Sequence, residues 1–416
     1  MSSDSHQAAA APASRPHVSA FWVVAFAFLI VMAFATLPSP LYGIYRERDH
    51  LSAFTITLVY SIWAAGTIAA LIAVPFIAAR IGRRGVMLAG VATMMVAAGE
   101  LTAWKTLPGL LVGRLLTGVS VGLAAGTAIA YLIELRLRAD PTASPGLART
   151  IGTSVNVGAL GIGPLVAGCL AEWARHPLTL SYLLWIGLGA VALVGLAAAP
   201  ETGAPAANRA PLAVRLPVAA GAATLAAFAA NGLFAGLSGL FLAATFHNRS
   251  HALAGATLFV VFSSGVVSQL ATARLRASRV FALGTISMLV GLALLVVAVR
   301  LSTPSLALFL ISGGLIGAGA GAVFKGTTGL VLDGTAPENR VAMTSELLIA
   351  LFIGLSLPVI GAGVALDRGA SSRNTVLGFA IVVGLGVAAA GWGLLGRRPK
   401  TSPEAATQTQ PKGDAP

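Results

Sequence analysis

Three charged residues lie within otherwise apolar stretches, where their side chains could do chemistry. Arg114 and Glu346 lie about six or seven residues after the start of an apolar stretch, and Lys325 lies about seven residues before the end of one. A charge embedded among apolar residues is costly and is rarely kept without a function. Arg114 either extends to an outer surface or serves a coupling or substrate site. Glu346 is a candidate proton carrier that pairs with Lys325 in one conformational state; a permanent structural pair, or contact of Lys325 with an anionic substrate, are the alternatives.

Two further acidic residues stand at the ends of apolar stretches. Glu134 and Asp333 are either solvated helix ends or gate contacts, and they are the next candidates for coupling. Uncharged polar and aromatic groups inside the apolar stretches are candidates for substrate contact. Asn231 is the first choice, and the others are Phe34, Asn156 and Gln269. Hydrogen bonding between helices, or core packing for Phe34, is the alternative interpretation.

Several function classes lack their usual residues. The chain has 1 cysteine and 6 histidines, and the histidines fall in tails, loops or the ends of apolar stretches. This pattern excludes a multi-cysteine metal site and offers no buried acid–base pair for an intramembrane enzyme. The sequence also has no phosphate-binding Gly-Lys-Ser/Thr loop. We therefore expect no enzyme activity, no metal and no cofactor, and the scattered arginines do not indicate nucleic-acid binding.

The composition explains where these residues lie. The 416 residues are 56% hydrophobic and only 10% charged, against about 25% charged in typical soluble proteins. Apolar stretches of about 20 residues, the length that crosses a bilayer, recur along the chain, so we predict an all-α membrane protein. Twelve membrane-spanning helices are expected, at 18–42, 54–79, 85–104, 107–135, 150–172, 178–199, 214–245, 252–273, 279–300, 303–332, 340–366 and 375–395.

Basic residues set the expected orientation. They gather in alternate connections, most densely in the run Arg80, Arg83 and Arg84, which places this run and both termini in the cytoplasm. The expected units are two six-helix bundles, 18–200 and 214–396, joined by a cytoplasmic linker, 201–213. Disordered cytoplasmic tails are expected at 1–17 and 397–416, where the composition could not form a core.

The two halves of the chain repeat one another. When they are aligned, Arg80 falls on Arg274, and Pro164 falls on Pro358. In a second alignment, Gly118 and Gly122 fall on Gly317 and Gly321. Two pseudo-symmetric bundles with a site between them form a transporter architecture.

Three motifs resemble the major facilitator superfamily. The run Arg80-Ile-Gly82-Arg83-Arg84 is similar to the basic half of its loop between spans 2 and 3, although Pro75 and Ala79 replace the Gly and Asp of that loop. Arg114, Gly118 and Gly122 resemble its span 4 motif. Gly163, Pro164 and Gly168 resemble the span 5 motif of drug and metabolite antiporters.

The resemblance implies a secondary transporter that works by alternating access. It implies gating roles for Arg80, Gly82, Arg83, Arg84, Gly163 and Pro164, with the basic run acting as a cytoplasmic latch; orienting the helices, or a merely tolerated proline, are the alternatives. We expect a monomeric, proton-coupled exporter of a small organic molecule in a bacterial inner membrane. An importer of a small metabolite, such as an organic acid or a sugar, is the alternative.

Overall fold

The computed structural model describes residues 15–202, 215–336 and 339–395, and every regular element in these ranges is helical. The predicted linker, 201–213, and the predicted tails, 1–17 and 397–416, lie almost wholly outside the described residues. The elements are α1 (Arg15–Thr36), η1 (Ser39–Leu41), α2 (Tyr42–Asp49), α3 (Ala53–Ala103), α4 (Leu107–Ala125), α5 (Ala128–Ala139), α6 (Gly146–Trp173), α7 (Pro177–Ala198), α8 (Val218–Phe246), α9 (His251–Ala271), α10 (Ala277–Arg300), α11 (Leu306–Asp333), α12 (Arg340–Asp367) and α13 (Ser372–Leu395).

Within the described residues, 11 helices are long and apolar enough to cross a membrane. The expected count of twelve differs because α3 contains the two predicted spans 54–79 and 85–104 in one element of 51 residues. Gly82 breaks this element, with φ 72° and ψ 177°. That backbone conformation is open to glycine but strained for other residues, so Gly82 turns the chain without a loop.

Two predicted helices are interrupted in the structure, and the first helix begins earlier than predicted. The predicted helix 18–42 ends at Thr36 and gives way to η1 and α2, because Pro38 and Pro40 lack the N–H groups that continue a helix. The predicted helix 107–135 divides into α4 and α5 at Gly126. α1 begins at Arg15, inside the predicted tail, since Pro16 is tolerated in a first helical turn.

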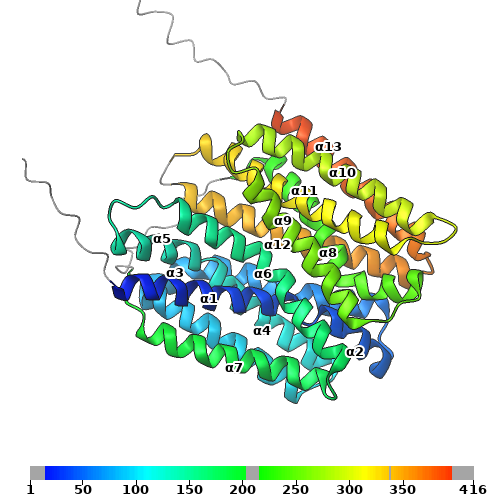
Figure 1. Cartoon of the computed structure of the whole chain (residues 1–416), viewed down its shortest axis with the longest axis horizontal. Coiled ribbons are helices and arrows are strands. Elements are labelled where there is room, and N and C mark those ends of the chain that lie inside the picture. Colours follow the sequence, from blue (N-terminus) through cyan, green and yellow to red (C-terminus); the bar gives the residue numbers. More distant parts are fainter. Residues whose placement is uncertain (1–14, 203–214, 337–338, 396–416) are drawn as a thin grey trace, which may run out of the picture.

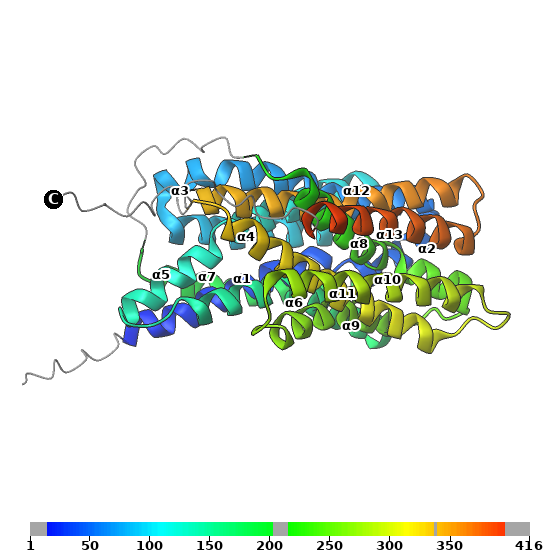
Figure 2. The ribbon, with the colours of Figure 1, turned by 90° about the horizontal axis from the view of Figure 1, so that it is seen from above.

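The helices of each half of the chain lie together. Figure 1 shows α1 to α7, blue to green, on one side of the molecule and α8 to α13, green to red, on the other. The halves meet where α6 packs against α9 and where α3 packs against α12. α1 begins on the left in Figure 2, and α13 runs from the right towards that side.

Repeated glycines allow the same close contact in both halves. A Cβ atom on Gly118 would strike the carbonyl of Trp63, and one on Gly317 would strike the carbonyl of Val261. Gly118 lies in α4 beside α3, and Gly317 lies in α11 beside α9. Small residues let membrane helices approach in this way, so the interpretation of these glycines as packing residues is confirmed.

Candidate functional site

Arg114 is fully buried in the first half, with an exposed fraction of 0%. Its guanidinium donates to the carbonyls of Ala35 at 2.6 Å and Tyr60 at 3.1 Å, and it lies 5.8 Å from the centre of the Trp63 ring. Ala35 stands in the last turn of α1, where helix carbonyls lack intrahelical partners. The interpretation that Arg114 extends to the surface was therefore wrong, and the side chain instead binds α1 and α3 to α4.

Lys325 and Glu346 do not form an ion pair in this state. The Lys325 amine donates to the carbonyl of Gln269 at 2.6 Å and to the Thr272 hydroxyl at 3.3 Å. It thus faces α9, whereas Glu346, in the second turn of α12, is exposed. The structure places the two charges in different surroundings, and Asp333, at the end of α11, is exposed as well.

The turn at Gly82 is held by two carboxylates of the first half. Glu201 accepts the backbone N–H groups of Arg83 and Arg84, each at 3.0 Å. The Arg83 guanidinium donates to Glu134 at 2.7 Å in an ion pair. Glu134 is thus a partner of the basic run rather than a simple solvated end, while Arg80 is exposed.

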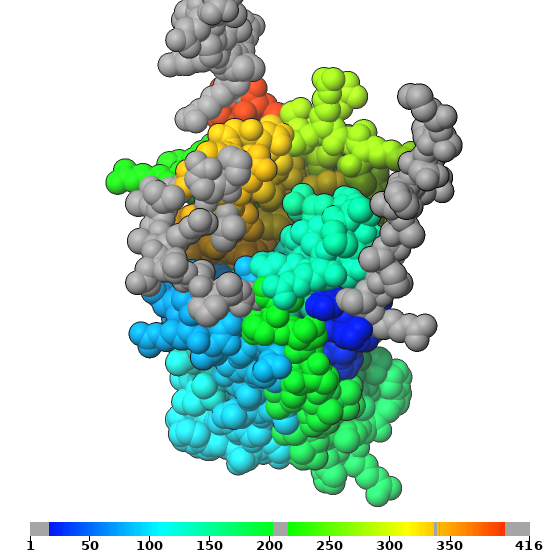
Figure 3. All heavy atoms as spheres, turned by 90° about the vertical axis from the view of Figure 1, so that its left-hand side faces the viewer, coloured from blue at the N-terminus to red at the C-terminus, as the bar shows by residue number. Residues whose placement is uncertain are grey.

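Glu201 was not among the predicted site residues. The only signal was its position in the Pro-Glu-Thr segment 200–202, directly after α7. Thr202 continues this contact, since its hydroxyl donates to Glu134 at 2.7 Å. Figure 3 looks onto this end of the molecule, with residues of the first half below, residues of the second half above, and the surface recessed between α5 and the yellow-to-orange residues of the second half.

Two other acidic side chains join the halves at the opposite end. Asp367 of α12 accepts backbone hydrogen bonds from the start of α3 at 3.0 and 3.1 Å. Glu172 of α6 accepts them from the start of α9 at 2.8 and 3.2 Å. Neither was predicted as a site residue, because an acidic residue at the end of an apolar stretch also has the pattern of a solvated helix end. In this state the halves are therefore bonded at the end away from Gly82.

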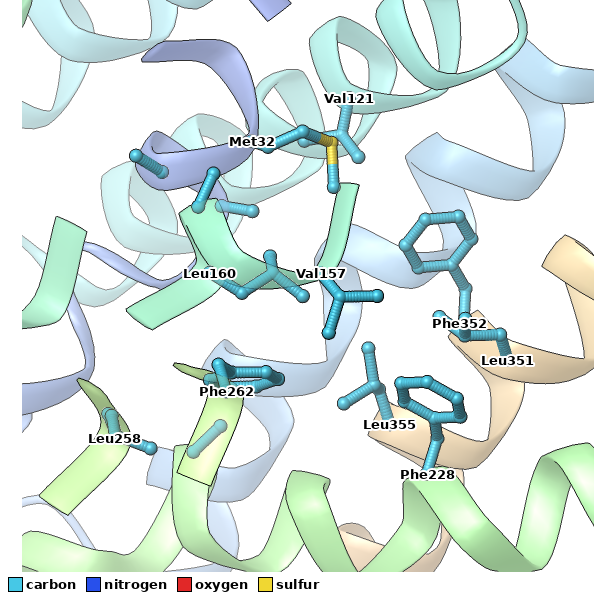
Figure 4. Close-up of a cluster of buried hydrophobic side chains, with 14 of the residues drawn as sticks. Met32, Val121, Val157, Leu160, Phe228, Leu258, Phe262, Leu351, Phe352 and Leu355 are labelled. Atoms are coloured by element: carbon cyan, nitrogen blue, oxygen red, sulfur yellow. The ribbon is translucent and has the colours of Figure 1, made fainter. Parts of the chain in front are cut away.

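Side chains from both halves converge between these two ends. Figure 4 shows an apolar cluster from six helices, and its labelled members are Met32, Val121, Val157, Leu160, Phe228, Leu258, Phe262, Leu351, Phe352 and Leu355. All of them are buried. The ring of Phe352 in α12 meets that of Trp63 in α3 edge to face, with centroids 5.5 Å apart. Much of the contact between the halves is therefore apolar and aromatic.

The predicted substrate contacts are buried, and three of them carry a polar atom without a partner. One amide atom each of Asn156, Asn231 and Gln269 has no hydrogen-bond partner among the described residues. Such atoms cost free energy unless a ligand or water binds them. Phe34 is fully buried and packs edge to face against Tyr182, with centroids 6.3 Å apart.

Three aromatic residues with partnerless polar atoms were missed. The hydroxyls of Tyr42 and Tyr60 and the Trp63 indole N–H are buried without a partner among the described residues. Tyr60 lies at the contact between halves, because a Cβ atom on Gly236 of α8 would stand 3.1 Å from its ring. No sequence pattern separates such residues from core aromatics.

Gly163 and Pro164 lie in α6 between two neighbours. A Cβ atom on Gly163 would strike the carbonyl of Ala33 in α1. The carbonyl of Pro164 faces Gly255 of α9 in the other half, again too close for a Cβ atom. Gly163 and Gly255 thus let α6 approach α1 and α9 closely, and the gating role of Gly163 and Pro164 stays a prediction.

Comparison with known proteins finds a match to a family model and matches to solved structures. Residues 27–171 match the family model described as "Sugar (and other) transporter", whereas no curated protein sequence matches the chain. A crystal structure of a mutant of the nucleoside transporter NupG shares the fold, with a TM-score of 0.68 at 11% sequence identity, over 92% of this chain and 99% of that one. The chain is therefore a multi-pass membrane protein that shares the fold of a solved transporter, and the match over residues 27–171 supports a carrier of the major facilitator superfamily.

Proposed function

We propose that this protein is a transporter of the major facilitator superfamily and that it acts as a proton-coupled exporter of a small, largely apolar organic molecule in a bacterial inner membrane. It acts as a monomer by alternating access, with both termini in the cytoplasm. In this proposal α3 crosses the membrane twice, with Gly82 at the cytoplasmic turn, and the twelve spans form two six-helix bundles that rock around a site between them.

The apolar contact between the halves is the observation that carries the proposal. Phe228, Phe262 and Phe352 come from three different helices and are buried together with aliphatic side chains (Figure 4). A sugar or a nucleoside presents many hydroxyl groups, and each would need a polar partner once it left water. A mainly apolar lining with a few polar groups suits a hydrophobic molecule that bears one or two polar atoms. Asn156, Asn231 and Gln269 would supply these partners.

The contacts at the two ends support alternating access from a state that faces the cytoplasm. Arg83 bonds Glu134 within the first half, so it does not bind the second half through this contact. The halves are bonded at the opposite end through Glu172 and Asp367. In the outward-facing state, we expect the basic run to bind the second half instead.

Glu346 is our proposed proton carrier. In the cytoplasm-facing state it is exposed at the start of α12, where it can exchange a proton with water. When the state changes, it would approach Lys325, whose amine would leave the Gln269 carbonyl. Arg114 would keep α1, α3 and α4 together while the halves move; Glu134 and Asp333 are the remaining candidates for coupling.

The test uses inside-out membrane vesicles that contain the transporter and an imposed proton gradient, acid inside. A panel of apolar and amphipathic organic compounds is screened for gradient-dependent uptake and for release of protons from the vesicles. For a compound that is transported, Phe352→Ala should raise the KM about tenfold or more, because a buried aromatic contact is lost. Phe76→Ala, at a residue 58% exposed in α3, is the matched control and should leave KM unchanged.

The importer remains the second candidate, favoured by the partnerless amide atoms of Asn156, Asn231 and Gln269. These groups could recognise a polar metabolite. The same vesicles distinguish the two functions: an importer would accumulate a sugar or an organic acid in right-side-out vesicles under an inward proton gradient. That result, without export of any apolar compound, would refute the exporter.

A further inference from the structure

The first residues of α3 are held by two different partners. Ser52 precedes the helix, and its hydroxyl accepts the N–H of Thr55 at 3.1 Å. The N–H groups of Ala53 and Phe54, which a helix cannot satisfy itself, are bound by Asp367 at 3.0 and 3.1 Å. Ser52 belongs to the first half and Asp367 to the second. The start of α3 is thus completed by the other half of the molecule.

The start of α9 has the same arrangement with the halves exchanged. Ser250 precedes this helix, and its hydroxyl accepts the N–H of Leu253 at 3.1 Å. The N–H groups of His251 and Ala252 are bound by Glu172, at 2.8 and 3.2 Å. Here the helix belongs to the second half and the carboxylate to the first. We call the two contacts the reciprocal caps.

The reciprocal caps occupy corresponding places in the repeat. Glu172 is in the last turn of α6 and Asp367 is the last residue of α12. These two helices carry the aligned residues Pro164 and Pro358. A carboxylate is favoured at a helix N-terminus both by hydrogen bonding and by the positive end of the helix dipole. The halves meet along two seams, α3 with α12 and α6 with α9, and the same chemistry closes both seams at this end of the molecule.

Neighbouring contacts between the halves are weaker. Arg249 and Glu47 form an ion pair at 3.3 Å, but their side chains are 81% and 71% exposed, and exposed pairs contribute little. The ring nitrogen Nδ1 of His251 lies 3.0 Å from the carbonyl of Pro40, which adds one hydrogen bond. The reciprocal caps contribute four backbone N–H bonds to charged acceptors, which is more than these neighbouring contacts between the halves contribute.

We infer that Glu172 and Asp367 form the outer gate: the reciprocal caps hold the cytoplasm-facing state and must separate before the outer end opens. The inference rests on the alternating access proposed above. It adds two gating residues at the end opposite the basic run. Each cap that is lost should increase the population open to the outside by about fivefold, as for a typical helix cap. Since the two caps share no residue, losing both should multiply the effects to about 25-fold.

The test measures opening directly, through a single cysteine at the seam. Thr57 of α3 is fully buried, with an exposed fraction of 0%, and its side chain stands where a Cβ atom on Gly363 of α12 would clash. In a Cys169→Ala, Thr57→Cys background, the rate of reaction with a membrane-impermeant maleimide is measured in right-side-out and inside-out vesicles. Neither a substrate nor a gradient is needed, so the result is independent of the substrate class and of the direction of transport.

Asp367→Ala and Glu172→Ala should each raise the labelling rate from the outside about fivefold. Asp367→Asn and Glu172→Gln, which keep an acceptor oxygen but lose the charge, should give smaller increases and guard against misfolding of the alanine variants. Glu47→Ala is the matched control, because it removes an exposed contact between the halves, and it should change the rate less than twofold. Unchanged labelling in either alanine variant, or an increase only from the cytoplasmic side, would overturn the inference.

Discussion

Gly82→Ala should destabilise the first half strongly. The new residue would have to adopt φ 72°, which costs about 1–3 kcal/mol for a residue other than glycine. Its Cβ would also stand 2.6 Å from Cδ of Glu201, so the carboxylate would have to leave the N–H groups of Arg83 and Arg84. Loss of such a cap costs a further ~0.5–2 kcal/mol. The sum is about 1.5–5 kcal/mol.

The assay measures the apparent melting temperature of the protein in detergent. The readout is the loss of the monodisperse chromatographic peak after heating. For a unit of this size, about 2–4 °C per kcal/mol corresponds to a decrease of roughly 3–20 °C. Gly99→Ala is the matched control: it lies in the same helix, a Cβ there meets nothing within 4 Å, and alanine should be neutral or slightly stabilising. A melting temperature of Gly82→Ala within about 2 °C of the control would refute the reasoning, because both the strain and the cap would then be negligible.

Three further substitutions test other parts of the molecule. Arg114→Ala should lower the melting temperature and abolish gradient-driven flux, because the Ala35 carbonyl loses its charged donor; full flux would contradict this. Glu346→Gln should fold normally, since the carboxylate is exposed, yet lose uphill transport while downhill exchange persists; normal uphill transport would exclude Glu346 as the carrier. Gly317→Ala should cost about 1–3 kcal/mol through collision with the Val261 carbonyl, whereas Gly361→Ala, with open space at its Cβ, should not; equal melting temperatures would contradict the packing argument.

Helix positions were predictable where apolar length alone decides them. The predicted helices 178–199 and 279–300 agree with α7 and α10 within two residues. Length also placed a break between the predicted spans 54–79 and 85–104, where Gly82 interrupts α3, but it did not show that a single residue with positive φ makes this turn. Nor did it place the end of α1, where two prolines inside an apolar stretch interrupt the backbone hydrogen bonds.

The site was less predictable than the fold, because many of its contacts use backbone atoms. The cost of an embedded charge singled out Arg114, but its carbonyl acceptors leave no mark in the sequence. Asp367 binds N–H groups more than 300 residues earlier in the chain, at separations of 313 and 314. For Lys325 and Glu346, the helix rise gives a depth in the membrane but not the direction in which each side chain points. Depth alone therefore suggested a pair that this state does not form.

The reciprocal caps have the form of an isologous interface, in which the same patch on two partners serves both sides. Two identical copies of one half, related by a two-fold axis, would each donate a carboxylate and receive one. In a single chain that carries both copies, each half still supplies a carboxylate to the other, but the sequence of each half can change independently. Here the two contacts already differ, because glutamate is longer than aspartate by one methylene and Glu172 also accepts the Ser250 hydroxyl at 3.1 Å. The two seams therefore need not be equally strong, and one of them can part first.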